Sequence, residues 1–133
     1  MLVAISIPIF SSQLEKSRDA VTLSNIRAAY AEVQAAYLTQ DSNISSNQTI
    51  DQNGQTITIQ PASNGTQIVT ITNVVAKGQS AGLNNQDQLP CDVEAKALDG
   101  MGTTPGNYTL TFTYTTTGEN TSVKLTKAEK AGA

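Results

Sequence analysis

The spacing of apolar residues over positions 8–40 predicts one long helix. Apolar side chains recur at alternating intervals of three and four residues, which lays a single stripe along a helix. The stripe consists of Leu23, Ile26, Tyr30, Val33 and Tyr37. We expect Phe10, Leu14 and Val21 to extend this face toward the N-terminus. Alanines add high helix propensity, and no Gly or Pro interrupts residues 11–40.

The length of this helix bears on the shape of the molecule. At about 1.5 Å per residue, a helix over residues 8–40 is about 50 Å long. A domain of 133 residues does not cover that length along one side. We therefore expect part of the helix to project beyond the globular body.

Beyond residue 42 the pattern changes to that of β-strands. Residues 49–52 and 55–60 flank Asn53-Gly54, the strongest short-range signal for a hairpin. A run of β-branched residues over 66–75 predicts a central strand. Residues 77–90, which are dense in Gly, Asn and Gln, are expected to form a loop.

The C-terminal part of the chain predicts a second hairpin. Residues 107–117 alternate strictly, with apolar side chains at every second position and threonines between them. The apolar set is Tyr108, Leu110, Phe112 and Tyr114. Before this strand, residues 92–98 predict a short helix and 99–106 a stretch of helix breakers. After a turn at 118–120, residues 121–126 return as a strand, and 127–133 are expected to fray.

These elements predict an α+β fold in which the long N-terminal helix packs against an antiparallel β-sheet of about four strands. The apolar stripe of the helix and the apolar face of the sheet are each expected to cover the other. The sheet residues expected on that face are Ile57, Ile59, Ile68, Val69 or Ile71, Leu110 and Phe112. The chain accordingly divides into an N-terminal helix, residues 1–41, and a β-rich head, residues 42–133.

The apolar run over residues 1–10 is too short to cross a bilayer alone. A span requires about 20 apolar residues, and Ser6 and Pro8 interrupt this shorter run. A secretory signal would need a basic start, yet no Lys or Arg precedes Lys16. We expect the run to be the end of a longer hydrophobic segment; the alternative is a buried helical start. Pro8 then either opens the helix or kinks one that begins upstream, and truncation favours the kink.

Four charged residues follow closely: Glu15, Lys16, Arg18 and Asp19. One interpretation is a solvated helix face with local ion pairs. The other is a set of charged partners for a neighbouring subunit in an assembly.

Composition excludes several classes of function. With a net charge of -3, the chain lacks the excess of basic residues that is typical of nucleic-acid-binding proteins. The chain has no His, and Cys91 is its single cysteine, so His-dependent catalysis and an intrachain disulfide are excluded. We expect no catalytic, cofactor-binding or metal-binding residues, and hence no enzyme. The four tyrosines are expected in the core, although display for contact or electron transfer is an alternative.

Four carboxylates lie close together in the sequence and raise the alternative of a calcium site. They are Asp87, Asp92, Glu94 and Asp99. Because they lack the spacing of an EF-hand loop, we expect them to be solvated loop acids. Cys91 is likewise expected to be a buried or incidental thiol, with an intermolecular bridge as the alternative.

Two segments of the helix carry a resemblance to a known family. They are Ile7-Pro-Ile-Phe-Ser-Ser-Gln-Leu-Glu-Lys-Ser-Arg-Asp-Ala20 and Leu23-Ser-Asn-Ile-Arg-Ala-Ala-Tyr-Ala-Glu-Val-Gln-Ala-Ala-Tyr37. Together they resemble the N-terminal helix of type IV pilins and related pseudopilins, particularly those of Gram-positive bacteria. The similarity ends near residue 41. A basic leader ending in Gly, a mature N-terminal Phe, a nearby Glu and an uninterrupted hydrophobic stretch are usual in that family and do not precede Met1.

The resemblance implies a structural subunit of a type IV pilus filament at the cell surface. Its partners would be identical or homologous pilin subunits, packed through their N-terminal helices with the heads outside. A longer precursor would be held in the membrane by the missing upstream helix, cut and methylated by a prepilin peptidase, and assembled on an inner platform. The expected assembly residues are Leu2, Ile5, Ile7, Pro8, Ile9, Phe10 and Leu14.

Two alternatives stay open beside the filament subunit. One is a pseudopilin or minor pilin of a type II secretion or DNA-uptake machine, which shares the helix. The other is an adhesive surface head in which the loop at 77–90 makes the contact and the helix is only an anchor.

Overall fold

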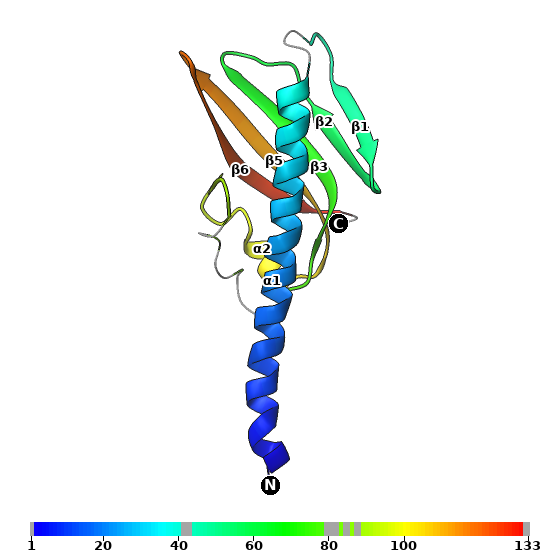
Figure 1. Cartoon of the computed structure of the whole chain (residues 1–133), viewed down its shortest axis with the longest axis vertical. Coiled ribbons are helices and arrows are strands. Elements are labelled where there is room, and N and C mark those ends of the chain that lie inside the picture. The colour runs from blue at the N-terminus through cyan, green and yellow to red at the C-terminus, as the bar shows by residue number, and fades with distance from the viewer. Residues whose placement is uncertain (1, 41–43, 79–82, 84–85, 87–88, 132–133) are drawn as a thin grey trace.

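The computed structural model describes residues 2–40, 44–78, 83, 86 and 89–131. Over these residues, a long helix α1 (Leu2–Thr39) lies against one face of a six-stranded β-sheet (Figure 1). The predicted α+β fold is confirmed. The sheet differs from the prediction in two respects, because it has more strands than four and one of its pairs is parallel.

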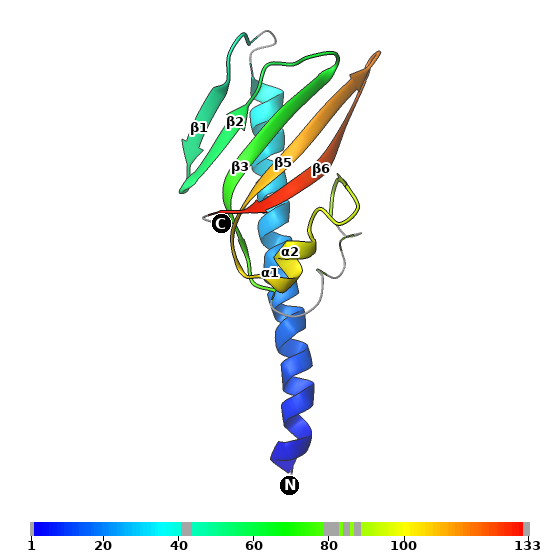
Figure 2. The same cartoon turned by 180° about the vertical axis from the view of Figure 1, so that it is seen from behind.

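Helix α1 extends well beyond the sheet. Its 38 residues span about 57 Å at 1.5 Å per residue, and its N-terminal part stands clear of the other elements in both views (Figures 1 and 2). Among the side chains described, those from Lys16 onward, burial begins at Asp19. The expected projection is therefore confirmed. Pro8 lies inside α1 rather than at its first turn, so the interpretation in which it opens the helix is wrong.

The strands of the sheet follow the order β1-β2-β3-β5-β6-β4. All neighbouring pairs are antiparallel except β4 and β6, which run parallel. A short helix, α2 (Asp99–Thr103), lies between β4 and β5. The strands are β1 (Gln48–Gln52), β2 (Gln55–Ile59), β3 (Thr66–Ala76), β4 (Asp92–Val93), β5 (Gly106–Thr117) and β6 (Asn120–Lys130).

The first hairpin and the central strand were predicted correctly. Asn53 and Gly54 have φ values of 53° and 76°, and two positive φ angles form the turn that matches the twist of the flanking strands. Gln52 pairs with Gln55 directly across this turn. Strand β3 lies between β2 and β5, as expected for a strand rich in β-branched residues.

The predicted helix over residues 92–98 is wrong. Asp92 and Val93 pair with Lys124 and Leu125 instead, and the Glu94 N–H donates to the Leu125 carbonyl at 2.9 Å. Lys96 has a φ of 66°, which a right-handed helix does not allow.

Helix α2 occupies part of the segment where breakers were expected. The Tyr108 hydroxyl contacts the carbonyl oxygens of Gly100 and Thr104 at 2.8 and 2.7 Å, and Met101 is fully buried. These tertiary contacts outweigh the low helix propensity of two glycines.

The expected fraying after residue 126 is also wrong, because β6 continues to Lys130. A bulge makes three steps along β6 correspond to two along β5. Phe112 pairs with Leu125, whereas Leu110 pairs with Ala128. The extra residue turns Ala128 toward the core, where it packs against buried neighbours.

The core lies between α1 and the sheet, as predicted. From α1 the buried apolar residues are Leu23, Ile26, Ala29, Val33 and Ala36, and Tyr30 and Tyr37 pack partly buried beside them. From the sheet they include Ile57, Ile59, Val69, Ile71, Leu110 and Phe112.

Two residues expected on the core faces lie elsewhere. Ile68 is only half-buried, because it alternates with the buried Gln67 and Val69 and faces the other side of the sheet. Val21 is 45% exposed, because the sheet covers the neighbouring face of α1 at Thr22 and Leu23. The side chains of Phe10 and Leu14 lie outside the described part.

Candidate functional site

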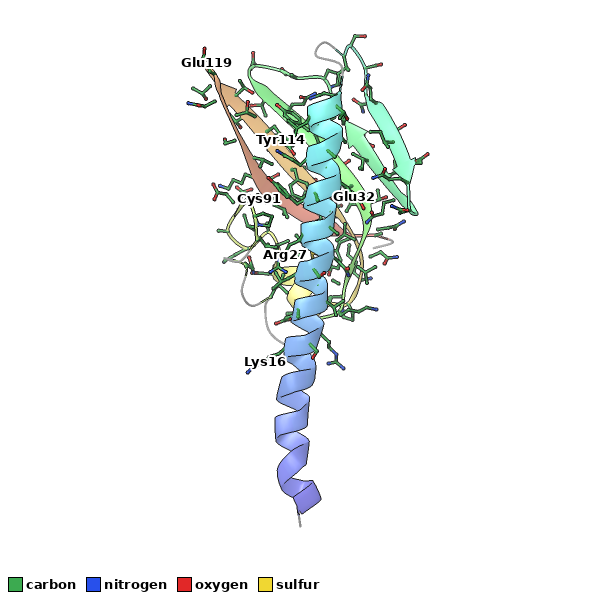
Figure 3. The ribbon with its side chains drawn as sticks, viewed as in Figure 1. Lys16, Arg27, Glu32, Cys91, Tyr114 and Glu119 are labelled. Atoms are coloured by element: carbon green, nitrogen blue, oxygen red, sulfur yellow. The ribbon has the colours of Figure 1, made fainter. Side chains whose placement is uncertain are left out.

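The predicted assembly residues lie on the projecting part of α1. Their backbone is helical, whereas the side chains of residues 1–15 lie outside the described part of the structure. Lys16 marks the point from which side chains are described, and it lies on α1 below the sheet in the view of Figure 3. The roles of Leu2, Ile5, Ile7, Pro8, Ile9, Phe10 and Leu14 therefore stay predictions.

Two hydrogen bonds hold α1 at the point where it enters the head, and a third lies within the helix. The Thr22 hydroxyl donates to the Arg18 carbonyl at 3.0 Å and accepts from the Lys77 N–H at 2.8 Å. The Asn25 amide donates to the Val75 carbonyl at 3.0 Å. The bonds with Val75 and Lys77 join α1 to the end of β3 and to the residue that follows it, and we call Thr22, Asn25, Val75 and Lys77 the collar.

The collar could not be identified from the sequence. Thr22 and Asn25 each lie one position before a residue of the apolar stripe, and their partners are more than 45 positions away. The sequence contains only a weak signal for Thr22, because this polar residue lies close to the buried face of the helix.

The charged residues before the collar do not share one environment. Asp19 is buried, with 3% of its surface exposed, so the interpretation of a solvated face is wrong for this residue. Lys16 is exposed and Arg18 is half-buried, while the side chain of Glu15 lies outside the described part. Pairing with a neighbouring subunit stays a prediction for this group.

A hollow with a volume of about 410 Å³ lies beside the collar. Val21 and Pro105 supply apolar surface, and Arg18 and Lys77 bring two positive charges to its rim. Ser17 completes the lining. The hollow has room for a side chain of another molecule where α1 leaves the head.

The face of α1 that points away from the sheet is lined mostly with small residues. Val21 and Leu38 are 45% and 69% exposed near its two ends. Between them the exposed small residues follow at alternating intervals of three and four: Ser24, Ala28, Ala31 and Ala35. The exposed Arg27 lies beside this row. A second helix could approach such a face closely, because small side chains keep the helix axes near each other.

The tyrosines at the other end of the core form a packed cluster. The rings of Tyr37 and Tyr114 stack with centroids 3.8 Å apart, and the Tyr114 hydroxyl donates to Gln34 Oε1 at 2.7 Å. Tyr30 packs against Phe112 with centroids 6.0 Å apart. Tyr108 and Tyr114 are buried, which confirms the core prediction for these two residues.

Burial has a marked effect on the phenol of Tyr114. The loss of hydration raises its pKa far above the ordinary value of 10.0, and the nearby Tyr30, Tyr37 and Cys91 raise it further. Tyr114 therefore stays a neutral hydrogen-bond donor in the folded protein.

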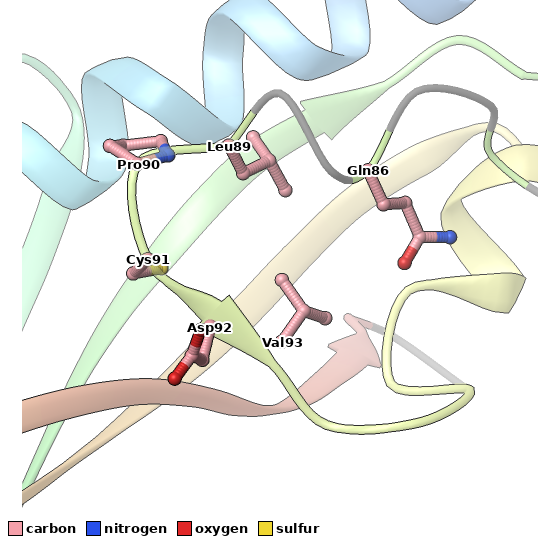
Figure 4. A pocket seen from close by; sticks show the side chains of 6 residues that line it. All are labelled: Gln86, Leu89, Pro90, Cys91, Asp92 and Val93. Carbon is pink, nitrogen blue, oxygen red and sulfur yellow. The ribbon is translucent and has the colours of Figure 1, made fainter.

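Cys91 lies half-buried at the edge of a second hollow, about 470 Å³ in volume (Figure 4). The other residues that line it are Gln86, Leu89, Pro90, Asp92 and Val93. Burial raises the pKa of the Cys91 thiol, and Asp92 adds to this effect, while a hydrogen bond with the Leu125 backbone opposes it. A thiol with a raised pKa is a poor nucleophile at neutral pH.

The described acidic residues of the alternative calcium site do not lie together in the structure. Over the described residues, no group of three or more His, Cys, Asp or Glu side chains is placed to hold a metal ion. Asp92, Glu94 and Asp99 are exposed, and Asp87 lies outside the described residues. Most of the loop at 77–90, the contact region of the adhesive alternative, also lies outside them.

Within the described part of the chain, no helix has an apolar stretch long enough to cross a membrane. Comparisons of the chain with protein-family models, with curated proteins and with solved structures gave no match.

Proposed function

We propose that this chain is a structural subunit of a type IV pilus filament. The observation that carries the proposal is the 38-residue helix of which the sheet covers only the C-terminal part. The uncovered part includes the apolar residues Leu2, Ile5, Ile7, Ile9 and Phe10. In a filament at the cell surface, these residues would be buried by the same segments of neighbouring subunits.

The hydrophobic effect supplies the driving force for this arrangement. Removing apolar surface from water contributes about 25 cal/mol per Å², so a bundle of such helices gains several kcal/mol per subunit. Contacts between different surfaces of identical chains do not close on themselves and generate a helical fibre. The heads would then lie outside the bundle.

The outward face of α1 supports the same proposal. Its row of small residues, from Val21 to Leu38, continues toward the head on the helix that carries the apolar run. Helices of neighbouring subunits can therefore pack closely along this part of α1 as well. The hollow at Arg18 and Lys77 would receive a side chain of the adjoining subunit.

The proposal is tested by placing charges on the projecting helix. Phe10→Asp combined with Leu14→Asp, made in the protein as the cell synthesises it, should abolish surface filaments, because carboxylates cannot be buried in an apolar bundle. Filaments are measured by shearing cells and by electron microscopy, and folding of the head by circular dichroism and thermal unfolding.

A matched control adds the same two charges elsewhere. Asn53→Asp combined with Asn64→Asp changes two exposed turn residues with φ values of 53° and 52°, which Asp tolerates. This variant should form normal filaments. Normal filaments from the Phe10 and Leu14 variant would contradict the proposal, and low subunit abundance in wild-type filaments would favour a minor pilin.

A further inference from the structure

Strand β1 forms one edge of the sheet. It pairs with β2 on one side, and no described strand pairs with its other side. Both views show it as the outermost strand, away from α1 (Figures 1 and 2). Its outer row of backbone N–H and C=O groups is a template for another strand.

The opposite edge of the sheet is protected against pairing with another chain. Strand β4 covers β6 at Lys124 and Leu125, and the Glu94 N–H adds a bond to the Leu125 carbonyl. Lysines at 124, 127 and 130 follow one another along β6. Charged edge strands of this kind resist pairing with other chains, whereas β1 carries a single charge, at Asp51.

The hairpin register determines which groups of β1 point outward. Gln52 and Gln55 flank a two-residue turn and form a hydrogen-bonded pair, so Gln52, Ile50 and Gln48 direct their backbone groups toward β2. The Gln60 N–H, directly after β2, donates to the Ile68 carbonyl of β3. Because backbone groups alternate in direction along a strand, the neighbouring Ile59 directs its own groups toward β1, which agrees with this register. The N–H and C=O groups of Thr49 and Asp51 therefore face outward.

Ile50 lies between these two residues. It is 37% exposed, although its partner Ile57 on β2 is fully buried. Among the described residues, the other exposed large apolar side chains are Val21 and Leu38, both on α1, so Ile50 is the one that lies on the sheet.

We propose that β1 pairs antiparallel with β1 of a second copy of this chain, about a two-fold axis at Ile50. Thr49 of each copy then exchanges both backbone hydrogen bonds with Asp51 of the other. Ile50 lies opposite Ile50 of the second copy in the non-hydrogen-bonded position, where side chains approach most closely. The strand is self-complementary in this register.

Charge and apolar burial select this register over its neighbours. Shifting the axis to Asp51 would place two like charges directly opposite each other, which destabilises a strand pair. Shifting it to Thr49 would place Ile50 opposite Gln48 and lose the apolar contact. In the proposed register Asp51 lies opposite the neutral Thr49.

The contact has a consequence for assembly. A two-fold axis that lies across a polar fibre would reverse the direction of its subunits, so β1 pairing about such an axis cannot repeat within one fibre. It would join two fibres that run in opposite directions, or two free chains. The inference does not depend on the proposed filament function.

Disulfide trapping of the full chain tests the pairing. In a Cys91→Ser background, Ile50→Cys should give a covalent dimer under mild oxidation, because the two thiols would lie directly opposite each other. Thr49→Cys is the matched control, because its thiol would lie opposite Asp51 rather than opposite itself. Mixing Thr49→Cys with Asp51→Cys chains should then yield the mixed dimer. Equal trapping at positions 49 and 50, or none at position 50, would overturn the proposal.

A proline at position 49 tests the backbone bonds. Thr49→Pro removes an N–H that points outward, so the head should unfold at nearly its original temperature. Losing one bond from each copy should weaken dimer trapping of the Ile50→Cys chain by roughly tenfold. Thr49→Val, which keeps the N–H, should trap normally. Undiminished trapping by a folded Thr49→Pro chain would also overturn the proposal.

Discussion

Tyr114 leads to a prediction about pH at the scale of single residues. Its pKa is raised in the folded protein, whereas the unfolded chain titrates near the ordinary value of 10.0. The associated stability is therefore fully present below pH 10 and is lost as the pH rises toward the folded pKa, by at most about 1.4 kcal/mol per pH unit. Urea unfolding between pH 8 and pH 11 measures this loss.

Tyr114→Phe provides the comparison. At neutral pH it should lower the free energy of unfolding by about 1 kcal/mol, because the bond to Gln34 is lost and the stack on Tyr37 remains. Above pH 10 the variant should lose stability less steeply than the wild type. Parallel pH profiles for the two proteins would show that the phenol of Tyr114 is not held neutral by the fold.

Residue-level prediction from the sequence was most accurate where periodicity alone decides burial. Leu23, Ile26 and Val33 are buried as the spacing indicated, because a helix packed on a sheet hides one stripe. One of the two interpretations of the charged group placed Asp19 on a solvated face, yet the fold buries it at the point where α1 meets the head. That environment is set by distant segments, and helix spacing contains no information about them.

At the scale of elements, β6 shows that a bulge interrupts the alternation of apolar and polar residues by which a strand is predicted. Strict alternation from Leu125 would place Lys127 and Glu129 on the core side, so the pattern gives no sign that the strand continues beyond residue 126. The bulge shifts the pattern by one residue, and Ala128 faces the core instead. The hairpin at Asn53-Gly54 was predictable because its signal is local.

The C-terminal part of β6 leads to a prediction for a truncated chain. Ending the protein after Thr126 removes the pairing of Leu110 with Ala128 and of Tyr108 with Lys130. We expect the free energy of unfolding to fall by about 2–4 kcal/mol, given about 1 kcal/mol for each lost hydrogen bond. Thermal and urea unfolding measure the change.

A chain that ends after Ala131 is the control, because it keeps these strand pairs and the bond from the Ala131 N–H to the Asn107 carbonyl. It should unfold like the complete chain. If the chain ending at Thr126 were equally stable, the last four residues of β6 would contribute nothing to the fold.

At the scale of the whole molecule, the projecting part of α1 is separate from the core. Among the described side chains, which begin at Lys16, the buried ones lie from Asp19 onward, and the collar holds α1 at Thr22 and Asn25. The sequence predicted a projection from length alone, whereas the collar depends on contacts between α1 and β3 that only the assembled fold creates.

This separation predicts that the head folds without the projection. A chain that starts at Lys16 should unfold cooperatively and within a few degrees of the full chain, because every core residue among the described side chains is kept. Differential scanning calorimetry measures both proteins, and Ile26→Ala serves as a positive control that lowers stability by about 2–5 kcal/mol. A large drop for the shortened chain would mean that the projection stabilises the head.

The collar also sets the angle at which the projecting helix leaves the head. Residues 2–22 span about 30 Å, so a tilt of about 10° at Thr22 moves the N-terminal end of α1 by about 5 Å, close to the width of a side chain. Packing between helices tolerates little error of that size. The hydrogen bonds of Thr22 and Asn25 thus control the position of the N-terminal end of α1, although neither residue lies in the projecting part.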